Sequence, residues 1–117
     1  MKITTMRDLL DAEVLCCEEN LSRHVYSACG CDLMSDVLAY VKDQAVLLTG
    51  LVNQQVIHTA EMMDMICIVF VRSKKPTPEM LELARESGIV ILSTDKRLYE
   101  ACGLLYSNGL VGNKVRQ

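Results

Sequence analysis

Polar and basic residues that could bind a small anion follow three apolar runs of this chain. Thr49-Gly50 comes after the first run, Arg72-Ser73-Lys74-Lys75 after the second, and Ser93-Thr94-Asp95 after the third. Hydroxyl, backbone N–H and basic groups at strand ends and helix starts suit a phosphate or another small anion, such as part of a nucleotide. We therefore predict a ligand site whose candidate residues are Asp32, Thr49, Gly50, Asn53, Arg72, Ser73, Ser93 and Thr94.

Ordinary helix capping is the alternative explanation for the same hydroxyl and amide residues. Ser, Thr and Asn at helix starts accept hydrogen bonds from free backbone N–H groups, which alone would account for Asn53, Ser93 and Thr94. The lone Gly50 also lacks the glycine-rich run and the Lys-Ser/Thr ending of a phosphate loop. The residue types leave both a ligand site and a set of caps open.

Cys29 and Cys31 are the candidate ligands of a metal or iron–sulfur site. Cys16 and Cys17, which we expect on the neighbouring strand, could add one thiolate, because adjacent residues of a strand point to opposite faces. The spacing differs from the usual Cys-x-x-Cys frameworks, and cysteines inside apolar patterns are typical of buried free thiols. We therefore expect reduced cysteines without a metal.

The titratable residues stand outside any recognisable catalytic signature. His24 lies in an expected strand and His58 on the polar face of an expected helix, with no nucleophile or metal partner at a diagnostic spacing. Asp32 and Asp36 share one helix face, where an acidic first turn that complements the helix dipole explains both. We expect a binding or regulatory module rather than an enzyme.

Composition limits the partners and the compartment. The 117 residues carry a formal net charge of −3, with a pI near 5.3, one Phe, four Tyr and no Trp. Nucleic-acid modules usually present a basic face and stacking aromatics, so we expect no nucleic-acid partner. No apolar run approaches the roughly 20 residues that span a bilayer, and the start lacks the core of a signal peptide. We predict a cytoplasmic protein without a membrane partner.

The central elements that must position the candidate site are two apolar runs with a helical pattern between them. Ala45–Leu48 and Ile66–Val71 lack polar alternation, which is typical of parallel strands covered on both faces. A helix that starts at Thr77-Pro78 and stops at Gly88 leads to a third strand, Ile89–Leu92. The right-handed crossover rule then predicts an α/β three-layer sandwich, with a mostly parallel sheet of about five strands and helices on both faces.

The remaining segments are expected to complete this sheet. Thr5 with Asp8 predicts a capped first helix, and strands over 13–17 and 24–29 are expected to pair side by side through a turn at Glu18–Asn20. Met34, Val37, Leu38 and Val41 predict a helix that starts at Asp32, and Ser93-Thr94-Asp95 opens a last helix that ends at Asn108-Gly109. We predict one domain over residues 1–110 and a C-terminal tail over 111–117.

This order of residues resembles the DRTGG domain family over nearly the whole chain. The resemblance lies in residues 21–28 with Asp32-Leu33-Met34-Ser35-Asp36-Val37-Leu38, in Leu48 to Ala60 with Ile68 to Val71, and in Ile89–Thr94 with Tyr99–Tyr106. Of the naming motif only Arg23 stands, with Ser22 in place of Asp and Tyr26-Ser27-Ala28 in place of Thr-Gly-Gly. If those glycines let a ligand approach the backbone, their loss removes that access here.

The resemblance implies an accessory domain that associates with itself. Domains of this family are similar to the N-terminal domain of HPr kinase/phosphorylase, and they occur beside CBS domains in regulated pyrophosphatases and beside phosphotransacetylase domains. Short versions are similar to those encoded near iron-only hydrogenase, iron–sulfur and signalling-kinase genes of anaerobic bacteria. The resemblance therefore implies a regulatory homodimer with a possible link to hydrogenase or iron–sulfur metabolism.

Three functional hypotheses follow. The first is a non-catalytic regulatory domain that forms a homodimer and senses an adenine nucleotide or a phosphorylated metabolite. The second is a protein-interaction module that docks a hydrogenase or signalling partner without a ligand. The third is a metal or cluster carrier that uses Cys29 and Cys31.

Overall fold

The computed structural model describes residues 1–40 and 44–112 of the chain. The helices and strands alternate along it in the order α1 (Ile3–Leu10), β1 (Glu13–Cys16), a 3-10 turn η1 (Glu18–Asn20), β2 (Ser27–Gly30), α2 (Met34–Tyr40), β3 (Ala45–Thr49), α3 (Gln54–Met62), β4 (Cys67–Phe70), α4 (Pro78–Ser87), β5 (Val90–Ser93) and α5 (Leu98–Ser107). Within these described ranges, none of the helices has the length and apolarity needed to cross a membrane.

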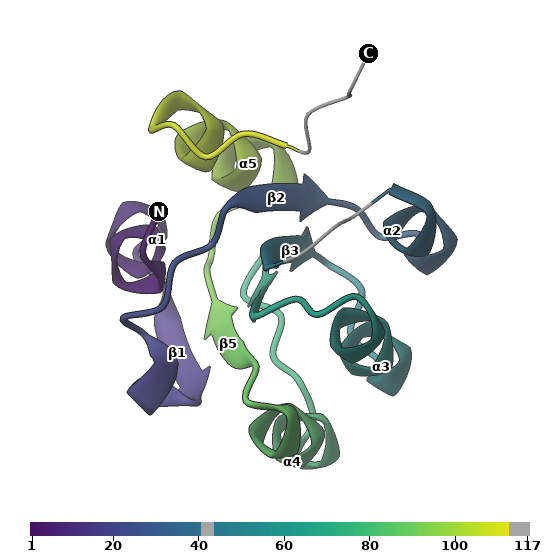
Figure 1. Ribbon diagram of the computed structural model, residues 1–117. Helices are drawn as coiled ribbons and strands as arrows, with labels where there is room; N and C mark the ends of the chain where they lie inside the picture. Colours follow the sequence, from purple (N-terminus) through teal and green to yellow (C-terminus); the bar gives the residue numbers. More distant parts are fainter. Residues whose placement is uncertain (41–43, 113–117) are drawn as a thin grey trace.

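The five strands form one sheet in the order β1-β5-β4-β3-β2. The neighbours among β2, β3, β4 and β5 pair in parallel, and β1 pairs antiparallel with β5. Figure 1 shows α2, α3 and α4 along one face of the sheet and α1 and α5 on the other. The predicted fold class, a three-layer α/β sandwich with a mostly parallel sheet of five strands, is confirmed.

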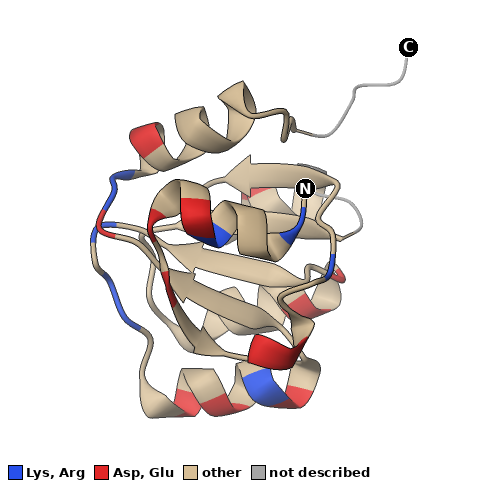
Figure 2. Cartoon of the chain, turned by 90° about the vertical axis from the view of Figure 1, so that its left-hand side faces the viewer, with Lys and Arg blue, Asp and Glu red and all other residues tan. Residues whose placement is uncertain are grey.

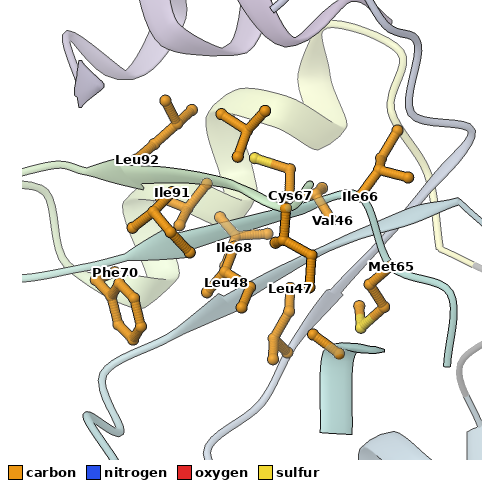
Figure 3. Packing of buried hydrophobic residues seen from close by; sticks show 14 of the residues in the cluster. Val46, Leu47, Leu48, Met65, Ile66, Cys67, Ile68, Phe70, Ile91 and Leu92 are labelled. Carbon is orange, nitrogen blue, oxygen red and sulfur yellow. The ribbon is translucent and has the colours of Figure 1, made fainter. Parts of the chain in front are cut away.

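The three central strands are buried along their whole length, as their continuous apolar sequence predicts. Every residue of β3, β4 and β5 is buried. In Figure 3, Cys67 and Leu92 project to one side of the sheet, and Leu47 and Phe70 project to the other. Burial of one large aliphatic side chain contributes about 1.5–3 kcal/mol to the free energy of unfolding. The side chains buried on both faces therefore stabilise the three central strands.

Two predicted helix starts and one predicted stop are confirmed. The side chain of Asn53 accepts a hydrogen bond from the Val56 N–H at 3.2 Å, and the Thr77 hydroxyl accepts one from the Met80 N–H at 3.3 Å. Gly88 ends α4 in the left-handed conformation, with φ of 71°. These local signals place α3 and α4 as the crossovers between the parallel strands.

The predicted pairing of the first two strands is wrong. β1 lies at one edge of the sheet beside β5, and β2 lies at the other edge beside β3. β2 also begins at Ser27 rather than at His24, which forms an isolated bridge with Lys2. The segment between β1 and β2 is longer than a hairpin turn, and β2 instead joins β3 through α2 as one more parallel crossover unit.

Three of the predicted helix starts are also wrong. Lys2 is the N-cap of α1, so Thr5 lies inside that helix. Arg97 is the N-cap of α5, so Ser93 and Thr94 precede this helix by several residues. α2 begins at Met34 rather than at Asp32. The expected continuation of α2 to Val41 lies outside the described residues, as do residues 113–117 of the predicted tail.

Candidate functional site

The carboxyl ends of the parallel strands bring the predicted site residues to one edge of the sheet. We call this the carboxyl edge, and it comprises residues 30–32, 49–53, 71–75 and 93–97, which follow β2, β3, β4 and β5. In open α/β sheets this edge is where helix starts and loops offer free polar groups to ligands. All eight predicted ligand residues lie within it, although the contacts below divide them into distinct groups.

Asp32, Thr49 and Gly50 form one hydrogen-bonded cluster. Asp32 Oδ1 accepts hydrogen bonds from the Thr49 hydroxyl and from the Gly50 backbone N–H, both at 2.8 Å. The Gly50 N–H, the Thr49 hydroxyl and the nearby charge of Arg72 hold the pKa of the Asp32 carboxyl below its ordinary value. Thr49 and Gly50 therefore bind an internal carboxylate, and only Asn53 of this loop acts as a helix cap.

Arg72 packs across the Gly50 backbone from the neighbouring strand end. A Cβ at position 50 would lie 2.7 Å from Arg72 Nη2, so glycine leaves the space that the guanidinium occupies. Arg72 and Ser73 are both left-handed, with φ of 57° and 56°, a conformation that costs non-glycine residues roughly 1–2 kcal/mol each. Strained residues of this kind cluster at functional sites and switch regions.

Backbone hydrogen bonds fasten this turn to the loop after β5. The Arg72 N–H donates to the Lys96 carbonyl and the Ser73 N–H donates to the Thr94 carbonyl, each at 2.8 Å. Arg72 thereby stays exposed at the surface while its backbone is fixed. The turn positions one cation beside the Asp32–Gly50 cluster.

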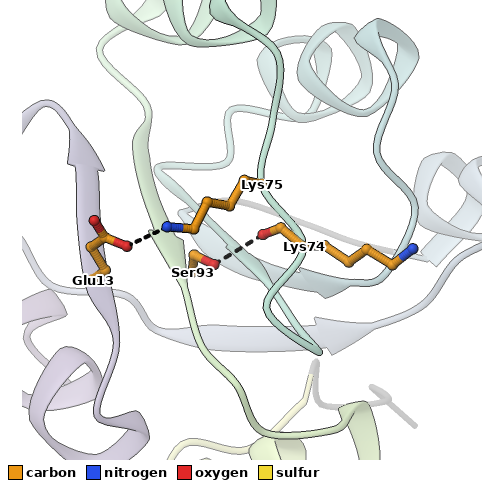
Figure 4. Close-up of polar contacts among 4 residues, drawn as sticks. All are labelled: Glu13, Lys74, Lys75 and Ser93. Atoms are coloured by element: carbon orange, nitrogen blue, oxygen red, sulfur yellow. Dashed lines mark hydrogen bonds and ion pairs between the residues drawn. The ribbon is translucent and has the colours of Figure 1, made fainter.

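Ser93 and Thr94 turn inward, although the sequence suggested that they face a helix start or a ligand. The Ser93 hydroxyl donates to the Lys74 carbonyl at 2.9 Å, as Figure 4 shows. The Thr94 hydroxyl donates to the Leu10 carbonyl at 2.7 Å, and both residues are buried. Their hydroxyls join neighbouring segments of the protein, so we leave them out of the ligand contacts proposed below.

Basic residues gather at the carboxyl edge of this acidic chain. Figure 2 shows them along the loops that follow β4 and β5. Lys75 forms an ion pair with Glu13 at 2.9 Å, and the Lys74 side chain in Figure 4 points away from that pair. Lys96 and Arg97 were not predicted as site residues, although they directly follow Ser93-Thr94-Asp95 in the sequence.

Cys16 and Cys17 lie at the β1 edge of the sheet, Cys29 and Cys31 lie on or beside β2 at the other edge, and Cys67 lies between them on the central strand β4. Cys16 lies on β1 and Cys29 on β2, so the expected contribution of Cys16 or Cys17 to a site at Cys29 and Cys31 is contradicted. Burial raises the pKa of Cys16 to about 12 and the pKa of Cys29 to about 11, which keeps both thiols protonated at neutral pH. All six cysteines are free, and among the described residues no group of three or more His, Cys, Asp or Glu side chains is placed to hold a metal.

A hollow of about 690 Å³ lies at the opposite edge, where the parallel strands begin. We call it the amino-edge hollow, and it was not predictable from the sequence, because its charged residues come from distant segments. Its charged lining residues are Arg23, Glu61, Asp64 and Glu86. The Ser87 hydroxyl donates to Glu61 at 2.8 Å across its rim. Its three carboxylates and one cation make it a poor match for an anion.

A comparison with protein-family models matches residues 5–107 to the DRTGG domain. The chain belongs to the DRTGG domain family. Within this DRTGG domain, Arg23 of the naming motif lines the amino-edge hollow and is therefore separated by the length of the sheet from Arg72 and Gly50. A comparison with curated proteins gave no significant match.

A search of solved structures supports the same fold. The DRTGG domain matches the CBS and DRTGG domains of the regulatory region of Clostridium perfringens pyrophosphatase, a structure complexed with the activator diadenosine tetraphosphate. The TM-score is 0.74 at 17% sequence identity, and the match covers 89% of this chain and 45% of that one. The chain thus spans less than half of that regulatory region.

Proposed function

We propose that this DRTGG domain is a non-catalytic regulatory domain that binds the phosphate groups of a small ligand, such as an adenine nucleotide, at its carboxyl edge. The observation that carries the proposal is the Arg72 guanidinium beside the Gly50 backbone, on loops after β4 and β5 that also carry Lys74, Lys96 and Arg97, in a chain of net charge −3. Guanidinium and ammonium groups form the strongest hydrogen bonds with phosphate oxygens. Phosphorylated metabolites suit the same chemistry.

The similar structure supports the choice of an adenine nucleotide. The regulatory region of the C. perfringens pyrophosphatase forms a complex with diadenosine tetraphosphate, whose four phosphates carry several negative charges. The carboxyl edge holds more basic residues than acidic ones, with Asp32 and Asp95 as its carboxylates, whereas the amino-edge hollow holds mainly carboxylates. Charge complementarity therefore favours the carboxyl edge as the place for the phosphates.

Calorimetric titration of the full chain with ADP, pyrophosphate and diadenosine tetraphosphate tests this proposal, with adenosine as the control without phosphate. We expect Arg72→Ala to weaken binding about tenfold, as for the loss of a charge-assisted hydrogen bond. Arg23→Ala is the matched control, because it removes the same charge from the opposite edge of the sheet. Absence of binding with every phosphate compound would contradict the proposal.

Protein association is a second candidate function, favoured by apolar side chains around the edge strand β2. Tyr26, Leu33, Leu38 and Tyr106 are 67%, 57%, 42% and 67% exposed, and they come from β2's flanks, α2 and α5. The outer edge of β2 is partly occupied, because the Ala28 N–H donates to the Val111 carbonyl at 3.1 Å, so the exposed apolar side chains rather than the strand backbone would make the contact with another chain. We propose that a homodimer forms here, and that a hydrogenase or signalling partner would bind the same surface.

Light scattering tests the homodimer. We expect Leu33→Asp to shift the wild-type dimer to a monomer, while Met62→Asp, on an exposed residue of α3, leaves it unchanged. A wild-type protein that is monomeric at micromolar concentration would contradict self-association. An unchanged elution volume of the domain mixed with a purified hydrogenase subunit or kinase would contradict that partner.

A further inference from the structure

We propose that Asp32 is an internal anion that occupies the phosphate position of the carboxyl edge and is displaced when a ligand binds. This inference rests on the proposed function and concerns the regulation of the same site. Asp32 Oδ1 accepts hydrogen bonds from the Thr49 hydroxyl and the Gly50 N–H, both at 2.8 Å. These are the donors that an incoming phosphate oxygen would use, since carboxylate and phosphate oxygens are equivalent as acceptors.

The surroundings of Asp32 are those of an anion site that is already filled. Arg72 packs against Gly50, and its charge acts on the Asp32 carboxylate. A phosphate and the carboxylate carry like charges and cannot share the same donors. The Asp32 side chain is exposed, so it can leave toward solvent without opening the core. When a phosphate displaces Asp32, the two hydrogen bonds that Asp32 accepts are replaced by two hydrogen bonds to the ligand.

The displaced carboxylate would release the segment between β2 and α2. Asp32 ties this segment to the Thr49–Gly50 turn, which lies 17 residues further along the chain. Leu33, the next residue, belongs to the exposed apolar set around β2. Occupancy of the phosphate position is thereby coupled to the surface proposed for association, because the same short segment carries both.

The test compares Asp32→Ala with Asp36→Ala, which removes the same charge from the first turn of α2. Binding of pyrophosphate and ADP is measured by calorimetry on the full chain, after circular dichroism has confirmed folding. We expect Asp32→Ala to bind about tenfold more tightly than wild type, because an internal competitor lowers the apparent affinity by the fraction of open protein. Asp36→Ala is expected to stay within about twofold of wild type.

The outcomes separate this inference from the proposed function. Equal or weaker binding by Asp32→Ala, while wild type binds, would overturn the inference and leave the proposed function standing. Absence of binding by both proteins would overturn the two together. If Asp32→Ala does not fold, Asp32→Asn keeps the shape of the side chain and is expected to show the same direction of change.

Hydrogen exchange measures whether the segment around Asp32 is released, which binding affinity alone does not show. We expect saturating pyrophosphate to speed amide exchange in a peptide covering residues 31–38 of the wild-type protein, since the tie to the Thr49–Gly50 turn is lost. The same peptide in Asp32→Ala should exchange fast before ligand is added. Slower exchange of this peptide in liganded wild type would overturn the displacement of Asp32.

Discussion

The guanidinium of Arg72 lies against the backbone of Gly50, so close that a Cβ at position 50 would be 2.7 Å from Arg72 Nη2. The two residues follow neighbouring parallel strands, β3 and β4. Gly50 therefore leaves the space in which the Arg72 guanidinium lies beside Asp32, whose carboxylate accepts a hydrogen bond from the Gly50 N–H. This contact is the geometric centre of the proposed phosphate site.

Gly50→Ala tests this contact. The added methyl group would push the flexible end of Arg72 away, so we expect phosphate binding to weaken about fivefold to tenfold while stability falls by less than about 1 kcal/mol. Gly103→Ala is the matched control, since a Cβ there meets nothing within 4 Å. Calorimetry and thermal melting measure the two effects. Unchanged binding by Gly50→Ala would show that Arg72 does not act from this position.

Gly30→Ala tests the packing of α5 on the edge strand β2. A Cβ at position 30 would lie 2.5 Å from Cys102 Sγ, so α5 or the sulfur must shift, and we expect a loss of about 1–3 kcal/mol in the free energy of unfolding. Adding Cys102→Ala removes the clashing sulfur and should recover part of that loss. Urea denaturation of the four proteins of this cycle measures the coupling, and additive effects would contradict the contact.

Thr77→Ala and Thr5→Ala separate a helix cap from a hydroxyl inside a helix. The Thr77 hydroxyl accepts from the Met80 N–H at 3.3 Å, so its removal should cost about 1 kcal/mol in the free energy of unfolding. Thr5 lies inside α1, where Ala has the higher helix propensity, so Thr5→Ala is expected to be neutral or slightly stabilising. Thermal melting in one buffer compares them. A larger loss from Thr5→Ala would contradict the start of α1 at Ile3.

The acid dependence of stability tests the Asp32 cluster. The pKa of Asp32 is lowered from 3.8 in the folded protein, chiefly by the Gly50 N–H and the Thr49 hydroxyl. The carboxylate therefore stabilises the folded state above the ordinary value, and this contribution is lost as the pH falls from 3.8 through the lower folded value. We expect wild type to melt above Asp32→Asn at pH 7 and the difference to shrink below pH 3.8. A difference that is independent of pH would contradict an ionised Asp32 in this cluster.

The sheet and its crossovers were predictable because their signals are local. Continuous apolar runs marked β3 to β5, and Thr77-Pro78 with Gly88 marked the ends of α4. The pairing of β1 was not predictable in this way, because residues 17–89 separate this edge strand from its partner β5. Two strands that follow each other in the sequence usually form a hairpin only when the loop between them is short.

The location of the candidate site was predictable from the sequence, but the hydrogen bonds within it were not. Strand ends indicated the carboxyl edge, whereas the bond between Asp32 and Thr49 joins residues 17 positions apart. Ser93 and Thr94 show the same limit, because a hydroxyl that can cap a helix can equally donate to a distant carbonyl, such as that of Leu10. The burial that decides between these roles comes from tertiary packing.

Phosphate binding at the carboxyl edge can be measured by mapping backbone amide shifts in a ¹⁵N-labelled full chain titrated with diadenosine tetraphosphate. We expect saturable shifts at Gly50, Arg72, Ser73 and Lys96, which lie around the Asp32 cluster. Residues of the amino-edge hollow, such as Arg23 and Glu86, should stay unchanged. Shifts confined to the amino-edge hollow, or no shifts at saturating ligand, would contradict phosphate binding at the carboxyl edge.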